Sequence, residues 1–167
     1  MPYNKGMEPA VKSGTPWHEA RVSWRRGDDK FTDQRYSRAH EWRFDGGVSV
    51  SASSSPANVR EPYSVPSAVD PEEALVAAAS SCHMLCFLSI AAREGYTVDS
   101  YEDAAYGVIE ENAEGRQAFS RITLRPEIMF LESCSPSAPD LAAMHQEAHR
   151  ACFIANSLCC EVVVAAA

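Results

Sequence analysis

The chain is organised around residues 70–95, which read DPEEALVAAASSCHMLCFLSIAAREG. Asp70 is a suitable N-cap, and Glu73, three residues later, completes a capping box. Gly95 is typical of the residue that follows a helix end. Between these ends the stretch is built from apolar and small residues, with His83 as the interruption. We therefore predict one helix of about six turns that is buried almost all round.

The length of 167 residues fits one domain with a real core. Because the start of the chain is polar, we expect residues 1–16 to form a flexible tail and residues 17–167 to form a single domain. Nucleic-acid binding depends on an excess of positive charge that contacts phosphates, whereas this chain has a net charge of −8. We therefore expect no nucleic-acid partner.

The apolar helix is long enough to span a bilayer. Its small residues, its acidic start and the polar remainder of the chain favour a core helix instead, so we expect no membrane partner. Residues 1–14 lack the apolar segment of a secretory signal. We therefore expect a cytoplasmic protein, in which cysteines are reduced, catalytic or metal-bound.

On both sides of this helix the sequence alternates between apolar and polar residues, as strands do, and contains residues typical of turns. Asp-Gly at 45–46 is a strong hairpin signal, and the three prolines within residues 53–68 indicate a crossing loop. A second helix is expected over residues 140–153, where apolar side chains recur at intervals of three or four. The expected strands cover residues 19–25, 35–44, 48–52, 97–110, 119–130 and 159–164. Strands before, between and after two helices give an α+β fold.

A helix as apolar as residues 70–95 needs cover on every face, and two small sheets from one chain are too little. We therefore expect a homodimer in which two such helices pack together.

The six cysteines are the residues with the most chemistry to offer, although free cysteine often packs simply as a small hydrophobe. Cys82 and Cys86 are four residues apart and share a helix face. Cys152 lies 70 residues after Cys82, on the second helix. No function is assigned to Cys86 beyond this shared face, nor to Cys134, Cys159 and Cys160.

A metal site is one interpretation of these residues. His145, His149 and Cys152 stand at i, i+4 and i+7 of the second helix, and Cys82 with Cys86 would add two thiolates. Zinc accepts such nitrogen and sulfur ligands. The ligands span far more chain than a compact zinc module does, so this metal-binding module is the less favoured alternative.

Thiol redox chemistry is the other interpretation, and it sets a physical requirement. Cys82 stands ten residues after Glu72, beyond the reach of the helix dipole, and burial raises the pKa of a thiol. A reactive Cys82 therefore needs a cation from elsewhere in the chain. Arginine is the natural donor, and a carboxylate such as that of Glu72 would hold it. The candidates are Arg35, Arg38 and Arg43 of the N-terminal hairpin.

These segments resemble the OsmC/Ohr family, the osmotically inducible and organic hydroperoxide resistance proteins. Residues 69–75 and 77–82, VDPEEAL and AAASSC, resemble the family's first cysteine helix with its ten-residue step from glutamate to cysteine. Residues 148–157, AHRACFIANS, resemble the region of the second family cysteine. Residues 45–56 resemble the family's strand-turn-strand entry. The likeness extends from about residue 21 to residue 164.

The resemblance implies an intertwined homodimer, with two antiparallel sheets around buried central helices and active sites at the subunit interface. It assigns a peroxidatic cysteine to Cys82, a resolving cysteine to Cys152, and the site arginine and glutamate to Arg38 and Glu72. Arg43 is the alternative to Arg38, because the family's Gly-Gly-Arg-Asp-Gly turn is absent here. Phe153 replaces the proline that usually follows the second cysteine.

The activity implied is a thiol-dependent peroxidase that reduces alkyl or lipid hydroperoxides through a Cys82–Cys152 disulfide. The partners are the organic hydroperoxide and an external dithiol reductant such as a lipoylated protein, with no bound cofactor or metal. Met84, Phe87 and Phe153 would give the site an apolar pocket, and His83 would be either a proton donor or, preferably, a polar edge of the helix. The alternative is a catalytically silent stress-response or ligand-binding protein of the same family.

Overall fold

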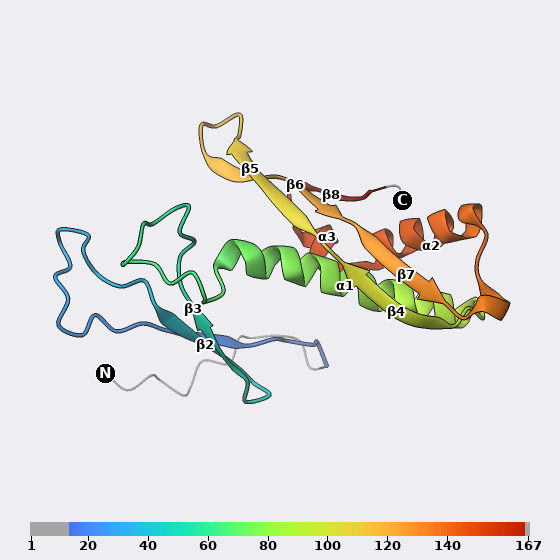
Figure 1. The fold of residues 1–167 in the computed structure, drawn as a ribbon, viewed down its shortest axis with the longest axis horizontal. Helices are drawn as coiled ribbons and strands as arrows, with labels where there is room; N and C mark the ends of the chain where they lie inside the picture. The colour runs from blue at the N-terminus through green and yellow to red at the C-terminus, as the bar shows by residue number, and fades with distance from the viewer. Residues whose placement is uncertain (1–13, 166–167) are drawn as a thin grey trace. The chain divides into compact units, whose positions relative to one another are not determined.

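The computed structural model describes residues 14–165, so residues 1–13 of the predicted tail lie outside the described part. The chain divides into two compact units, Met1–Ala68 and Val69–Ala167, and each is described by itself. Figure 1 follows the chain from the blue N-terminal unit into the green helix that begins the second unit. The prediction of a single domain over residues 17–167 stays a prediction.

The first unit contains an antiparallel sheet of β1 (Ala20–Ser23), β2 (His40–Phe44) and β3 (Ser49–Ala52) in the order β1-β2-β3. The predicted hairpin is confirmed, and Gly47 takes a φ of 85° in its turn. The expectation that β2 begins at residue 35 is wrong. The backbone N–H groups of Ser37 and Arg38 donate instead to the Asp29 carboxylate and the Tyr63 carbonyl, at 2.9 and 2.8 Å.

The central helix of the second unit is α1 (Pro71–Arg93), and its predicted start is confirmed. The Asp70 carboxylate accepts the N–H of Glu73 at 2.7 Å, and the Glu73 carboxylate accepts the N–H of Asp70 at 3.3 Å. The helix ends at Arg93. Gly95, two residues later, has a φ of 85°, which suits a glycine after a helix end. Two reciprocal side-chain hydrogen bonds therefore fix where α1 begins.

The burial of α1 is one-sided within the chain, so the expectation of burial all round is wrong for the isolated protomer. The residues with buried side chains are Ala79, His83, Phe87, Ile90 and Ala91. On another face Leu85 is 62% exposed. Among residues 14–165, α1 is the one helix long and apolar enough to cross a membrane, a test that a core helix also passes.

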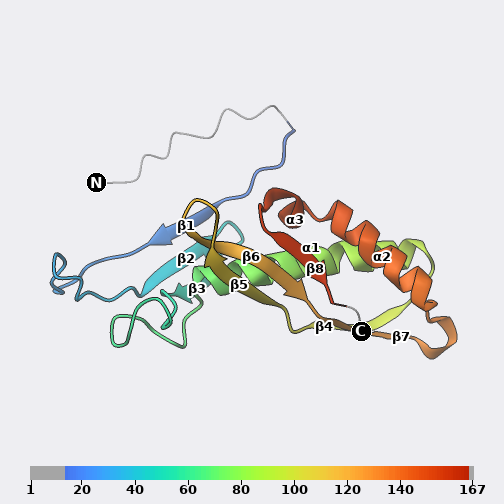
Figure 2. The same ribbon diagram turned by 90° about the horizontal axis from the view of Figure 1, so that it is seen from above.

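The predicted long strands at 97–110 and 119–130 are each split in two. β4 (Val98–Asp103) pairs with β7 (Pro126–Phe130), while β5 (Tyr106–Glu111) pairs with β6 (Gln117–Leu124). β8 (Glu161–Val164) joins β6 in parallel, so the described residues form three sheets, one of them mixed, rather than two antiparallel ones. The α+β class itself is confirmed, and Figure 2 shows β8 beside β6.

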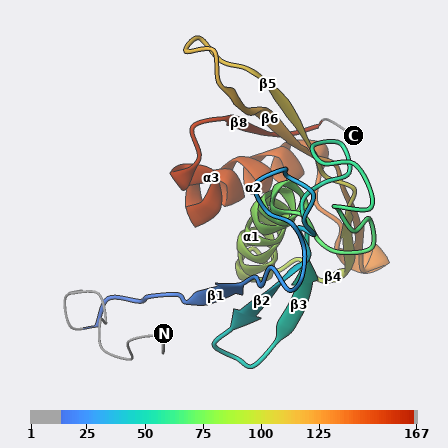
Figure 3. The same ribbon diagram turned by 90° about the vertical axis from the view of Figure 1, so that its left-hand side faces the viewer.

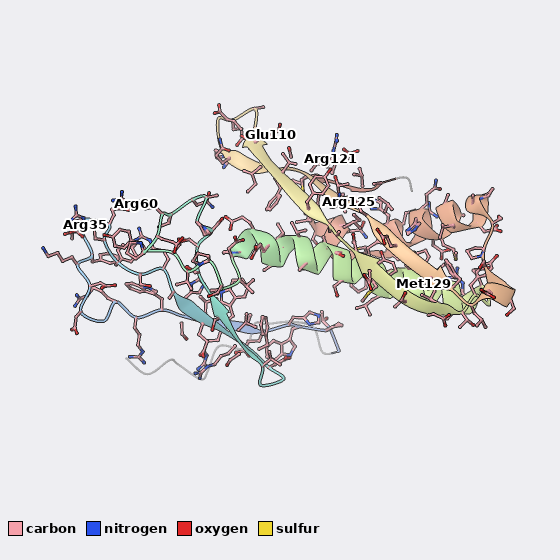
Figure 4. All side chains as sticks on the ribbon, in the orientation of Figure 1. Arg35, Arg60, Glu110, Arg121, Arg125 and Met129 are labelled. Carbon is pink, nitrogen blue, oxygen red and sulfur yellow. The ribbon has the colours of Figure 1, made fainter. Side chains whose placement is uncertain are left out.

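Arg125 explains why both strands break at the same level. Its backbone N–H donates to Asp103 at 2.7 Å, and its guanidinium donates to the Ala104 carbonyl at 2.9 and 3.0 Å. Pro126 follows and has no N–H to offer a ladder. Figure 4 labels Arg125 at the point where β5 and β6 give way to β4 and β7.

The predicted second helix begins two residues early and is interrupted. A 3-10 turn (Glu132–Cys134) precedes α2 (Ala138–Ala151), and α3 (Phe153–Ser157) follows after Cys152, which belongs to neither helix. Figure 3 shows α3 and α2 beside α1. The interruption at Cys152 redirects the chain within one residue.

Two apolar clusters divide the core along α1. One forms where the C-terminal half of α1 meets α2 and the β4–β7 pair, with Phe87, Ile90, Ala91, Met144 and Ala148 buried. The other forms where the N-terminal half meets the β5-β6-β8 sheet, with Ala79, Ile122, Leu124 and Val162 buried. The two sheets are thus both attached to one helix.

Gly107 on β5 is required by close packing between α1 and the sheet. A methyl group added there would stand 2.9 Å from Cδ1 of Phe119 and 3.0 Å from Cγ2 of Val76. We expect Gly107→Ala to lower the free energy of unfolding by about 1–3 kcal/mol, as overpacking does. Gly46→Ala is the control, because nothing lies within 4 Å of that position. Equal urea midpoints for the two variants would contradict this packing.

Candidate thiol site

The structure brings Cys82 and Cys152 together. Cys82 lies in the middle of α1 and is half-buried, and the side chain of Cys152, which is 1% exposed, lies near enough to lower the pKa of Cys82. Cys152 is the N-cap of α3, with its sulfur accepting the N–H of Ala155 at 3.3 Å. The Asn156 amide donates to the Arg150 carbonyl at 3.0 Å across the interruption. The break between α2 and α3 therefore positions the Cys152 thiol near Cys82 of α1.

The environment of Cys82 favours its thiolate. Burial raises the pKa of the Cys82 thiol, but hydrogen bonds from the Cys152 side chain and the backbone N–H groups of Ile154 and Phe153 lower it by more. A smaller lowering comes from Cys86. The pKa of Cys82 therefore lies below its ordinary value, as it does for thiols at the start of a helix.

The two neighbouring thiols are shifted the opposite way. Burial, and then the hydrogen bond to Cys82, raise the pKa of Cys152 to about 11. Burial and the adjacent Cys82 also raise the pKa of Cys86. All three cysteines are free, so the site holds one thiol disposed to ionise beside two that stay protonated.

Glu72 and Cys82 are not brought together within one chain. Both lie on α1, and ten residues at 1.5 Å each separate them by about 15 Å along the axis. Glu72 is half-buried in the first turn, where its charge suits the positive helix end. A single site that uses both residues must take them from two copies of α1.

Arg38 lies in the first unit, on the loop before β2. Its guanidinium donates to the carbonyls of Gln34 and Tyr36, at 2.8 and 2.5 Å, and stands 3.8 Å from the centre of the Tyr36 ring. The alternative, Arg43, is paired with Glu41. Figure 4 labels Arg35, the third candidate, on the loop that leads to β2. The role of a site arginine stays a prediction.

The apolar residues predicted to line the site have separate environments. Phe87 is fully buried in the cluster shared with α2, so it is a core residue. Met84 is half-buried on α1, and Phe153 is 81% exposed. Only Phe153 offers a large apolar surface next to Cys152.

The predicted cluster of His145, His149 and Cys152 does not form a metal site. Within residues 14–165, no group of three or more His, Cys, Asp or Glu side chains is arranged to hold a metal ion. Cys152 leaves the helical spacing by capping α3, and His145 faces His83 instead. The zinc interpretation is therefore wrong for the described residues.

His83 is a buried core residue, so the preferred interpretation of it as a polar helix edge is wrong. It is 1% exposed, and its Nε2 lies 3.1 Å from Nδ1 of His145 in a shared hydrogen bond. Phe87 also stacks on His145, with ring centres 4.6 Å apart. One turn before His83, the Ser80 hydroxyl donates to Asp103 at 2.5 Å. A polar layer thus separates the two apolar clusters.

This polar layer holds its imidazoles neutral. Burial, followed by the nearness of His145 and His149, lowers the pKa of His83 to about 4, against a smaller opposing effect of Asp103. Burial also lowers the pKa of His145. Two neutral imidazoles can form this hydrogen bond, because one ring supplies an N–H donor and the other an acceptor nitrogen. Two protonated rings have donors only.

The amide donors of α3 are the functional groups that sequence reasoning missed. The sequence points to a cation, with arginine as the natural donor, whereas the N–H groups of Phe153 and Ile154 also lower the pKa of Cys82. No glycine or proline marks the break at Cys152. The one local signal is Cys152 itself, a residue able to accept the first N–H of a new helix turn.

Comparison with known proteins places this chain in a family. The model of the OsmC-like protein family matches residues 64–166. An OsmC-like protein of unknown function from Vibrio cholerae is 50% identical, with a TM-score of 0.88 over 90% of this chain and 99% of that one. The chain therefore belongs to the OsmC-like family.

More distant structures share the fold. An organic hydroperoxide resistance protein from Elizabethkingia anophelis is 14% identical, with a TM-score of 0.68 over 93% of this chain and all of that one. The organic hydroperoxide resistance protein of Bacillus subtilis is 12% identical, with a TM-score of 0.59 over 89% of this chain and 96% of that one. A comparison with curated proteins found no match.

The buried imidazole makes stability depend on pH. Between about pH 6.5 and pH 4 the unfolded chain binds a proton at His83 that the native chain does not, so stability falls as the pH is lowered through this range. The loss amounts to about 3 kcal/mol for this one group. We expect His83→Gln to lose less unfolding free energy than the wild type between pH 7.5 and pH 4.5, measured by urea denaturation.

The exposed His18 gives the matched control, His18→Gln, which should keep the wild-type pH dependence. A His83→Gln variant with the same loss as the wild type would show that another group carries the effect.

Proposed function

We propose that this protein is a thiol peroxidase that reduces organic hydroperoxides to alcohols. The observation that carries the proposal is the contact between Cys82, whose pKa is lowered, and the buried Cys152. One thiol favours the anion that attacks a peroxide, and the other stays protonated until it is needed. Fold similarity to two proteins named for organic hydroperoxide resistance brings the substrate class into the proposal.

The chemistry balances within this pair of thiols. The Cys82 thiolate attacks the terminal peroxide oxygen, the O–O bond breaks, and an alkoxide leaves as the alcohol after taking a proton. Cys82 becomes a sulfenic acid, and the Cys152 sulfur displaces its hydroxyl as water to form a Cys82–Cys152 disulfide. An external dithiol, such as a lipoylated protein, then returns both cysteines to thiols and is itself oxidised to a disulfide.

A homodimer with sites at the subunit interface is part of the proposal. Glu72 lies about 15 Å along α1 from Cys82, so two helices that run antiparallel and cross near Ala77 would place Glu72 of the partner subunit beside Cys82. Leu85, 62% exposed on an otherwise apolar helix, would be covered by the same contact.

Arg38 completes the proposed site. Its guanidinium would pair with the thiolate and with the Glu72 carboxylate, since an arginine can donate to two anions at once. Its hydrogen bonds to Gln34 and Tyr36 and its stacking on Tyr36 hold it in one orientation within the first unit. We place the protein in the cytoplasm, where thiol reductants are available.

The central test compares peroxide consumption by the wild type and Cys82→Ser. We expect the wild type with excess dithiothreitol to consume cumene hydroperoxide, and Cys82→Ser to fall to the rate of the buffer, because the attacking sulfur is gone. Stopped-flow measurement gives both rates, and peptide mapping of the oxidised wild type should show the Cys82–Cys152 crosslink.

Cys159→Ser is the matched control, because Cys159 is exposed and has no part in the proposed reaction. Equal rates for the wild type and Cys82→Ser, with no crosslinked peptide, would remove the enzyme and favour a catalytically silent family member.

The proposed dimer is tested by placing a charge at Leu85, which the subunit contact would cover. Leu85→Glu should convert a species of twice 18.3 kDa into a monomer in sedimentation velocity, because a charge would be buried between the helices. Met129→Glu is the control, since Met129 is 67% exposed on β7, labelled in Figure 4, and absent from the core cluster that β7 shares with α1. A monomeric wild type would contradict the interface.

A further inference from the structure

A third thiol lies within reach of the proposed reacting sulfur. Cys86 follows Cys82 by four residues on α1, so the two side chains are neighbours on one face of the helix. Cys82 therefore has two neighbouring thiols, Cys152 from the α2–α3 break and Cys86 from its own helix, and both affect its pKa. The peroxidase reaction described above uses only the first.

The two thiols differ in exposure. Cys152 is 1% exposed, so a disulfide between Cys82 and Cys152 can be attacked by an external dithiol only at the half-buried Cys82 sulfur, which expels Cys152. Cys86 is half-buried. Leu85, proposed for the subunit contact, projects about 100° away from Cys86 around the helix, so that contact and access to Cys86 use different faces.

The two thiols also differ in the disulfide they can form. Side chains at i and i+4 of a helix have Cβ atoms about 5–6 Å apart, whereas a disulfide needs about 3.5–4.5 Å. A Cys82–Cys86 bond therefore requires a local shift of α1 and is the more easily reduced of the two. Cys152, at a break between helices, has no such constraint from a continuous helix.

We propose that Cys86 is a second resolving thiol, which displaces Cys152 from oxidised Cys82 and presents the resulting disulfide to the external dithiol. This inference rests on the proposed peroxidase. In the exchange, the Cys86 sulfur loses its proton and attacks Cys82, and Cys152 leaves and takes a proton. The external dithiol then attacks Cys86 and expels Cys82, and its second thiol closes the reductant's own disulfide.

Thiolate stability favours this direction of the last step. A disulfide breaks most readily toward the sulfur that is the better anion. The amide donors of Phe153 and Ile154 lower the pKa of Cys82, whereas burial raises the pKa of Cys86. Attack on Cys86 therefore releases the stabilised Cys82 thiolate, ready for the next peroxide.

The first test removes Cys152. One equivalent of cumene hydroperoxide is added to Cys152→Ser in the presence of dimedone, and peptides are mapped by mass spectrometry. We expect a Cys82–Cys86 crosslink, and a dimedone adduct of Cys82 only when Cys86→Ser is combined with Cys152→Ser. An adduct without a crosslink in Cys152→Ser overturns the relay and leaves the peroxidase standing. No adduct and no crosslink in either variant overturns both.

The second test measures reduction. Pre-oxidised wild type and Cys86→Ser are mixed with excess dithiothreitol, and free thiols are counted over time. We expect Cys86→Ser to recover about tenfold more slowly, because attack on its Cys82–Cys152 disulfide at Cys82 must expel Cys152, a thiol of raised pKa. Cys159→Ser is the matched control and should recover at the wild-type rate. Equal recovery by Cys86→Ser and the wild type would overturn the relay.

Discussion

The rest of the structure depends on a single constraint: one helix, α1, supplies a packing face to every sheet of the second unit. Its C-terminal half packs on β4, β7 and α2, and its N-terminal half packs on β5, β6 and β8. The sheet cannot follow the helix as one continuous ribbon, so it divides where Arg125 binds Asp103 and Ala104. The burial of the apolar face of α1 thus determines that the second unit has two sheets and where one sheet ends and the other begins.

The division of the sheet has a chemical consequence for the helix beneath it. Asp103, which ends β4, accepts the hydroxyl of Ser80, and one turn later His83 and His145 share a hydrogen. A polar layer therefore crosses the core at the level of Cys82, flanked by apolar packing on both sides. Because the hydrogen bond between His83 and His145 joins α1 to α2, the layer helps to fix the register of the two helices, and that register decides where Cys152 falls relative to Cys82.

The sequence predicts what is decided locally and fails where distant residues meet. The start of α1 depends on Asp70 and Glu73, three residues apart, and the hairpin depends on its own turn, so both are predictable. The strand breaks depend on a contact between Asp103 and Arg125, 22 residues apart, and the burial of His83 depends on His145, 62 residues away. The cysteine pair is suggested by family resemblance, but no glycine or proline marks the break that joins it.

The chemistry of the thiol site follows from that unpredicted break. A sulfur in the middle of an apolar helix is expected to stay protonated, because burial opposes the anion. Continuous helix from α2 through residue 157 would direct the N–H groups of Phe153 and Ile154 into its own hydrogen-bond ladder. Interrupted at Cys152, the chain leaves those donors free of the α2 ladder, and they lower the pKa of Cys82. One interruption thus supplies the second thiol and the backbone donors that lower the pKa of the first.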